Sequence, residues 1–152
     1  MSVKSFRGRL LGQNSGTLTP LKIRLSTPNG MTGYKINKFQ AMPANPTNAN
    51  SENLLQIWKE KGAAEQTASG NNDIDFNSPL LLAALYIENN AGDDNTFVKD
   101  QVIFDNEIIN QDIYLTNEGV EQNINFYIEL EQVKLSVDEA TVATLKDMRG
   151  RE

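Results

Sequence analysis

The strongest constraint on the fold is an alternation of apolar and polar residues that recurs along the chain. It is clearest over residues 124–130, where every second residue is apolar. The same pattern occurs over residues 21–25, 34–36, 102–104 and 113–115. A period of two is typical of β-strands that bury one face and leave the other in water. The chain therefore reads as a series of half-buried strands.

Turn-forming residues separate these apolar segments at short intervals, and they include Asn117-Glu118-Gly119. We predict about seven or eight strands, which together define an all-β fold: a single antiparallel β-sandwich that is jelly-roll-like. The length of 152 residues suits one domain, so we expect one β-sandwich domain over residues 1–152. The predicted strands lie near residues 3–11, 19–27, 32–41, 53–60, 79–88, 98–105, 110–116 and 122–135.

Three segments between the clear strands need separate arguments. Residues 80–87 are continuously apolar after Ser78-Pro79, a start that would also suit a helix. Because the run is short and its neighbours are strands, we favour a buried strand. Residues 54–61 leave strand and helix open. The polar stretch over residues 59–75 is predicted to be a long exposed loop.

The alternation changes phase after Leu130, since Val133 and Leu135 have the opposite parity. One extra residue explains such a change, so we predict a β-bulge near Glu131 and Gln132, or a strand that bends there and changes sheet.

The C-terminus has a helical pattern. Residues 136–139, Ser-Val-Asp-Glu, match a capping box, and Gly150 follows the last residue with helical spacing. We predict a short C-terminal α-helix over about residues 137–149. It should cover a sheet edge or pack on a neighbouring subunit.

The composition removes several kinds of chemistry. The chain has no cysteine and no histidine, which excludes thiol nucleophiles, disulfides and imidazole bases, and removes the usual zinc ligands. Residues 1–11 lack the apolar stretch of a signal peptide. The longest apolar run, residues 80–87, is far shorter than the roughly 20 residues that span a bilayer. We expect a soluble protein with no cofactor, no cleaved leader and no membrane partner.

Three groups of oxygen-bearing side chains are candidate sites. Glu129 and Glu131 share one strand face, and a carboxylate pair can serve acid–base chemistry. The intervening apolar face explains the pair fully as a solvated or intersubunit strand face, so we predict no catalytic residue. Asp93-Asp94-Asn95 and the pair Asp73 and Asp75 offer hard oxygens for calcium, but neither has EF-hand spacing. We interpret both as solvated turns and predict no metal site.

Charge is divided unevenly along the chain. Residues 1–51 contain seven basic residues and no acid, whereas residues 52–152 contain the other seven bases and all twenty acids, which gives +7 against −13. Three interpretations stay open. Basic and acidic strands pair within a sheet, or a basic face meets an acidic face of the next copy. The third is a basic face on nucleic acid, which the acidic remainder and the absence of interleaved aromatic residues disfavour.

The second interpretation defines a candidate assembly interface. Trp58 is included in this interface as an aromatic anchor. Large aromatic side chains, here Trp58, Phe39, Tyr34 and Phe126, are expected to lie in the core or at an interface. The candidate interface residues are Lys4, Arg7, Arg9, Lys22, Arg24, Trp58, Glu129 and Glu131.

Several segments also carry a family resemblance. Residues 33–39 read Gly-Tyr-Lys-Ile-Asn-Lys-Phe and precede a turn rich in proline and asparagine. Ile-Tyr-Leu at residues 113–115, Asn-Phe-Tyr-Ile-Glu-Leu-Glu at residues 125–131 and the capped helix over residues 136–149 complete the pattern. Over residues 30–150 the chain resembles small β-sandwich virion structural proteins of aquatic tailed bacteriophages.

This resemblance implies a virion location after synthesis in the host cytoplasm, and a capsid or capsid-decorating role. The implied partners are copies of the chain itself or other virion proteins, and no catalytic residue is carried over. The alternative is a tail, fibre or other host-surface module that binds carbohydrate, because loops with Asn, Asp and Trp58 suit sugar binding. An enzyme that works through carboxylates alone is the third hypothesis.

Overall fold

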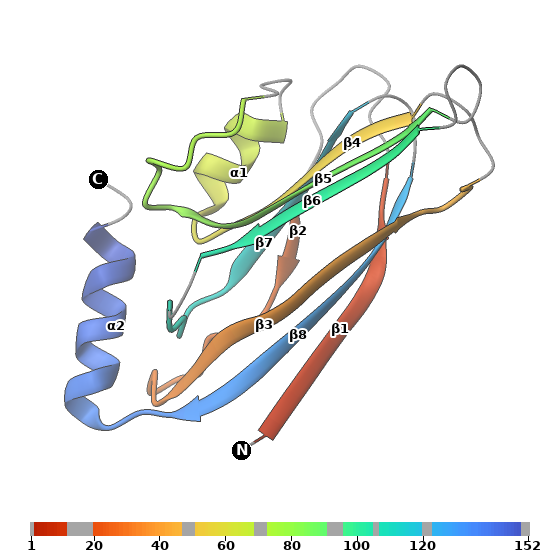
Figure 1. Cartoon of the computed structure of the whole chain (residues 1–152). Helices are drawn as coiled ribbons and strands as arrows, with labels where there is room; N and C mark the ends of the chain where they lie inside the picture. Colours follow the sequence, from red (N-terminus) through yellow and green to blue (C-terminus); the bar gives the residue numbers. More distant parts are fainter. Residues whose placement is uncertain are drawn as a thin grey trace.

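The computed structural model describes residues 2–11, 20–46, 51–68, 73–90, 96–104, 107–119 and 123–149. These ranges contain eight strands and two helices in two packed sheets (Figure 1). The elements are β1 Ser2–Leu10, β2 Leu21–Ile23, β3 Thr32–Pro43, β4 Ser51–Trp58, α1 Lys61–Ala68, β5 Leu81–Asn90, β6 Thr96–Ile103, β7 Ile113–Gly119, β8 Ile124–Lys134 and α2 Val137–Arg149.

The strand order is that of a jelly roll with one strand displaced. One sheet has the order β1-β8-β3 and the other β2-β7-β4-β5-β6, and the strand pairs within them are antiparallel. In a jelly roll of eight strands, the first strand pairs with the eighth, the second with the seventh, the third with the sixth and the fourth with the fifth. Three of these four pairs are present here: β1–β8, β2–β7 and β4–β5. The antiparallel sandwich predicted from the sequence is confirmed.

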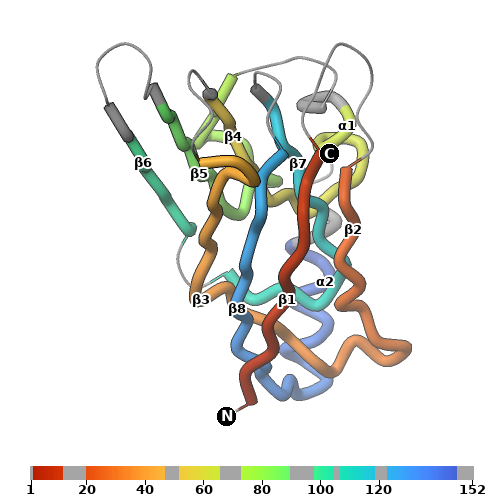
Figure 2. Tube along the Cα trace, turned by 90° about the vertical axis from the view of Figure 1, so that its right-hand side faces the viewer, coloured from red at the N-terminus to blue at the C-terminus, as the bar shows by residue number. Residues whose placement is uncertain are grey.

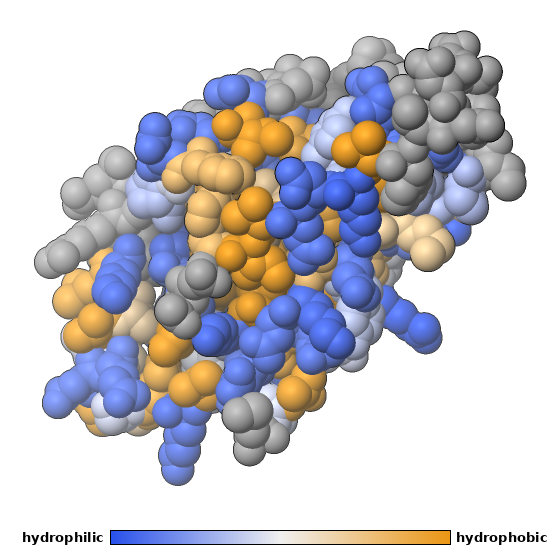
Figure 3. All heavy atoms as spheres, in the orientation of Figure 1, coloured by the Kyte–Doolittle hydropathy of each residue, from blue (hydrophilic) through white to orange (hydrophobic). Residues whose placement is uncertain are grey.

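The displaced strand is β6, which pairs with β5 instead of β3. Among the described residues no ladder of hydrogen bonds joins β3 to β6, so this side of the sandwich is open (Figure 2). Apolar side chains are visible across the middle of this side of the molecule (Figure 3).

The main core lies between the two sheets. The alternation over residues 124–130 works as predicted, because Ile124, Phe126, Ile128 and Leu130 are all buried. They pack with inward residues of the other sheet such as Leu85. Full burial of one such side chain contributes about 1.5–3 kcal/mol, so this cluster accounts for much of the stability.

Residues 80–87 form a strand, as favoured. β5 lies between β4 and β6, and residues 81–85 are buried without a break. Leu82 and Leu85 belong to the main core, whereas Leu81 packs with Trp58 and Ala64 in a second cluster on the opposite side of the sheet. A strand covered on both faces loses the alternation, which explains the continuous apolar run.

The predicted long loop over residues 59–75 is wrong, because it contains α1. Ala64 is fully buried against Trp58 and Leu81, so the helix covers part of the outer face of the five-stranded sheet. Lys61 and Glu65 form an ion pair at 3.6 Å with the spacing that favours helices. The helical spacing of Lys61 and Glu65 and the two alanines at positions 63 and 64 are the sequence features that favour a helix here.

The predicted bulge in β8 is also wrong. Glu131 and Gln132 pair without interruption with both β1 and β3. The register shift lies instead on β3, between Ile36 and Lys38. The change of phase has another cause: Leu135 comes after the end of β8, where its amide donates to the carbonyl of Met31 at 2.8 Å.

The C-terminal helix is confirmed as α2, with both bonds of its capping box. The Glu139 amide donates to the Ser136 hydroxyl, and the Ser136 amide donates to the Glu139 carboxylate, each at 3.2 Å. The helix stands at one end of the sandwich (Figure 1). Asn110 holds it there, because its amide nitrogen donates to Thr144 Oγ1 at 2.9 Å and to the Ala140 carbonyl at 3.3 Å.

Candidate functional site

The outer face of the three-stranded sheet brings four of the predicted interface residues together. Arg7 and Arg9 of β1 lie opposite Tyr127 and Asn125 of β8, and Glu129 and Glu131 continue the same face. The described helices lie elsewhere, at the end of the sandwich and on the other sheet (Figures 1 and 2). Met42 of β3 is 62% exposed on this face.

The other predicted interface residues lie elsewhere. Lys4 follows the inward parity of β1, and its ammonium donates to the Tyr34 hydroxyl at 3.4 Å and lies 5.7 Å from the ring centroid. Lys22 is in the other sheet, where it forms an ion pair with Asp112 at 3.2 Å. Arg24 is exposed just after β2. The predicted set therefore does not form one surface.

Trp58 is not a surface residue. It is only 6% exposed and lies in the second core cluster under α1. Its prediction as an interface anchor is corrected to a core position of the single chain. Phe39, Tyr34 and Phe126 are core residues as well.

Part of the uneven charge is neutralised within the three-stranded sheet. Lys35 and Lys38 of β3 lie opposite Glu131 and Glu129 of β8. The Lys38 ammonium is 3.9 Å from the Glu129 carboxylate. Exposed pairs of this kind contribute about 0–1 kcal/mol. For these residues the uneven charge of the sequence is therefore explained by pairing of basic and acidic strands within one sheet.

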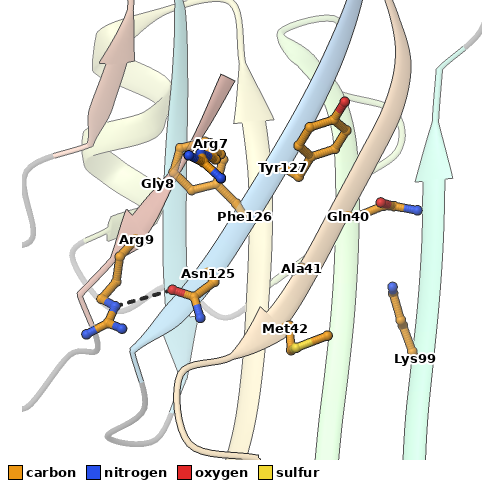
Figure 4. A pocket seen from close by; sticks show the side chains of 10 residues that line it. All are labelled: Arg7, Gly8, Arg9, Gln40, Ala41, Met42, Lys99, Asn125, Phe126 and Tyr127. Carbon is orange, nitrogen blue, oxygen red and sulfur yellow. Dashed lines mark hydrogen bonds between the residues drawn. The ribbon is translucent and has the colours of Figure 1, made fainter. Parts of the chain in front are cut away.

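A cationic groove of about 710 Å³ lies on the outer face of the three-stranded sheet, at the other end from Glu131 (Figure 4). We define the cationic groove by Arg7, Arg9 and Lys99, and none of the ten described residues that line it is acidic. Lys99 comes from β6, across the open side of the sandwich. Gln40, Asn125 and Tyr127 add polar groups to the lining, and the rest of it is glycine or apolar. Arg9 Nε donates to Asn125 Oδ1 at 3.3 Å.

The outer face of the five-stranded sheet carries the opposite charge. Glu52 of β4 lies directly opposite Glu88 of β5, and Asp100 of β6 lies opposite Tyr86. We call Glu52, Glu88 and Asp100 the acidic face. Burial, followed by the nearby carboxylates of Glu52 and Glu88, raises the pKa of Tyr86, whose hydroxyl donates to Glu88 at 3.3 Å.

A second groove, of about 450 Å³, lies beside α2. Ile108, Leu135 and Val142 supply apolar lining, and Asp138 and Glu139 lie among the acidic residues around it.

A buried polar cluster lies on the outer face of β4 and β7. Gln56 is directly opposite Thr116, and Glu118 follows two residues along β7. All three are at most 2% exposed, and side-chain atoms of each have no hydrogen-bond partner among the residues that the structure describes. Burial raises the pKa of Glu118 to about 7. Sequence analysis assigned Asn117-Glu118-Gly119 to a turn, which is wrong because these residues end β7.

The predicted solvated turns are partly described. Asp73 and Asp75 are exposed, and Asp75 Oδ1 accepts a bond from the Asn77 amide at 2.9 Å, as in a turn. Asp93-Asp94-Asn95 lies outside the described residues. Within the described ranges, no group of three or more Asp or Glu side chains is placed to hold a metal ion. No helix there is long and apolar enough to cross a membrane.

Sequence analysis missed Lys99, Gln40 and Asn125 in the groove, as well as the acidic face. Each is an ordinary polar residue of a strand, and only the register of the sheets brings them together. Comparison with protein-family models, with curated proteins and with solved structures found no match. Function is therefore inferred from the fold and the surfaces of the chain.

Proposed function

We propose that this protein is a non-enzymatic structural subunit that assembles with copies of itself, as a capsid or capsid-decorating protein of a virion. The observation that carries the proposal is a jelly-roll strand order combined with oppositely charged groups of residues on the outer faces of the two sheets. Jelly rolls are common in viral capsid proteins and in lectins. The sequence resemblance to virion proteins of aquatic tailed bacteriophages supports the virion location.

Strand β1 supports an assembling role. It is nine residues long, forms the edge of its sheet and is exposed over most of its length. Long exposed edges invite pairing with other chains, and natural proteins limit such pairing with charged side chains. Lys4, Arg7 and Arg9 supply those charges. A partner for this region is therefore selected by its negative charge rather than by strand pairing alone.

The mass of the purified protein at several salt concentrations tests self-assembly. Salt shortens the screening length from about 10 Å at 0.1 M to about 3 Å at 1 M. We expect oligomers at low salt that dissociate as salt rises. A monomer at every salt and protein concentration would contradict self-assembly. Oligomers whose mass does not change with salt concentration would indicate apolar contacts between subunits.

The virion location needs its own test. Purified particles should contain the chain in a fixed, stoichiometric amount, measured by quantitative mass spectrometry. Absence of the chain from particles would contradict the virion role even if the purified protein assembles.

The second candidate function is carbohydrate binding by a tail, fibre or other host-surface module. It is favoured by the amide groups of Gln40 and Asn125 beside the Tyr127 ring in the cationic groove. Such groups hydrogen-bond and stack on sugars. Glycan binding by the monomer that Tyr127→Ala abolishes, while Tyr114→Ala leaves it intact, would favour this function over assembly.

A further inference from the structure

We infer that copies of this chain dock head to tail, with the cationic groove of one copy on the acidic face of the next. This inference rests on the proposed function, because it names the two surfaces through which the subunits assemble.

The cationic groove brings together three basic side chains from two strands of different sheets. Arg7 and Arg9 are two residues apart on one face of β1, and Lys99 lies across the open side of the sandwich (Figure 4). All three side chains are exposed, and no acidic side chain is among the described residues that line the groove. Guanidinium groups bind carboxylates with paired, charge-assisted hydrogen bonds. The groove is therefore suited to a partner that presents carboxylates.

The acidic face has the matching chemistry. Glu52 and Glu88 are directly opposite on neighbouring antiparallel strands, an arrangement of like charges that destabilises a sheet. Asp100 is on the adjacent strand, beside Tyr86. Val98, which lies opposite Glu88, is 44% exposed and adds apolar contact area. Cations from a docked copy would offset the repulsion between the carboxylates.

The two surfaces lie on opposite faces of the sandwich, and β6 takes part in both. Successive residues of a strand point to opposite sides, so Lys99 faces the groove while Val98 and Asp100 belong to the acidic face. Opposite faces of one molecule cannot meet each other. The contact therefore joins different patches on two copies, and repetition of such a contact produces a ring or an open stack.

A second copy explains both surfaces, whereas other occupants explain one. Nucleic acid or an anionic polysaccharide would fit the cationic groove but would be repelled by the acidic face. The groove beside α2 is a weaker acidic partner, because Lys146 lines it and Glu107 is already paired with Lys59.

Charge reversal on each surface tests the docking. One variant is Arg7→Glu with Arg9→Glu, and the other is Glu52→Lys with Asp100→Lys. Each changes exposed side chains, and circular dichroism checks that both variants fold. At low salt, sedimentation should show for each variant alone an assembly constant weaker by at least about tenfold. A 1:1 mixture should recover assembly, because each reversed surface then finds an opposite charge.

The matched control is Arg24→Glu with Lys134→Glu, which reverses two exposed basic residues outside the groove and changes the net charge equally. It should assemble nearly as well as the unmodified chain. Loss of assembly in this control, or no recovery in the mixture, would overturn the docking while leaving self-assembly in place. A monomeric unmodified chain would instead overturn the proposed function. A groove variant that loses binding to heparin but still assembles would identify the groove as a site for anionic polymers and would overturn the docking.

Discussion

Glu118 is a carboxyl group whose ionisation opposes folding. It is 1% exposed, Leu54 lies directly opposite, and burial raises its pKa from 4.5 to about 7. Between these values the unfolded chain releases the proton more readily than the folded chain. The free energy of unfolding therefore falls as pH rises from about 4.5 to about 7, by up to about 3 kcal/mol, and the loss remains complete above that range.

Glu118→Gln should remove this pH dependence, because glutamine keeps the shape without the charge. We expect the variant to be more stable than the unmodified chain by up to about 3 kcal/mol at pH 8 and nearly equal at pH 4.5. Urea denaturation at the two pH values measures the difference. An equal effect at both pH values would mean that ionisation of Glu118 is not the cause.

Asp112 has the opposite pH dependence. Burial opposes its ionisation, but hydrogen bonds from the amides of Ser26 and Leu25 and from Lys22 outweigh burial and lower the pKa from 3.8 to about 2. Its contribution is therefore present above about pH 4 and is lost as pH falls towards 2. Asp112→Ala should lower the free energy of unfolding by about 2 kcal/mol at pH 7. In urea denaturation the difference should shrink towards pH 2, and a constant difference would contradict this origin.

At the scale of elements, the sequence predicted most strands and α2 because each has a local signal, whereas residues 54–61, which overlap β4, were left open between strand and helix. Alternation marks β8, and a capping box marks α2. The failures arose where tertiary contacts decide. α1 forms because Ala64 packs against Trp58, and the register shift on β3 depends on its pairing with β8. Arg7, Arg9, Glu129 and Glu131, which the sequence analysis placed in one set, lie on one sheet face. The strand register that adds Lys99 cannot be predicted from sequence spacing.

Trp58 and α1 form a unit whose loss should lower stability rather than assembly. Trp58→Ala should cost about 3–5 kcal/mol, the usual loss for a buried aromatic residue. The indole nitrogen has no hydrogen-bond partner in the described ranges, so Trp58→Phe should cost much less. Thermal unfolding of both variants measures this difference. If Trp58→Ala left the melting temperature unchanged but prevented assembly, the assignment of Trp58 to the core would be wrong.

At the scale of the whole molecule, the winding of the jelly roll redistributes the charge of the chain. β8 is acidic along its outer face and lies between the basic strands β1 and β3, so part of the imbalance between the N-terminal third and the remainder is neutralised inside one sheet. Part of the remaining charge lies in the cationic groove and on the acidic face. The pairing of β6 with β5 instead of β3 adds Lys99 to the groove and Asp100 to the acidic face.

Hydrogen exchange should therefore report assembly at particular strands. Within the described part of the chain, β6 pairs with β5 alone and β1 with β8 alone, so both edges should exchange faster in the monomer than β5, which is paired on both sides. Low salt should slow exchange several-fold in β1 and β6, which carry the groove and part of the acidic face. β5 should change much less, since its amides are already paired. Slowing confined to α2 would place the contact beside that helix, and uniform slowing across all strands would indicate a general gain of stability instead of docking.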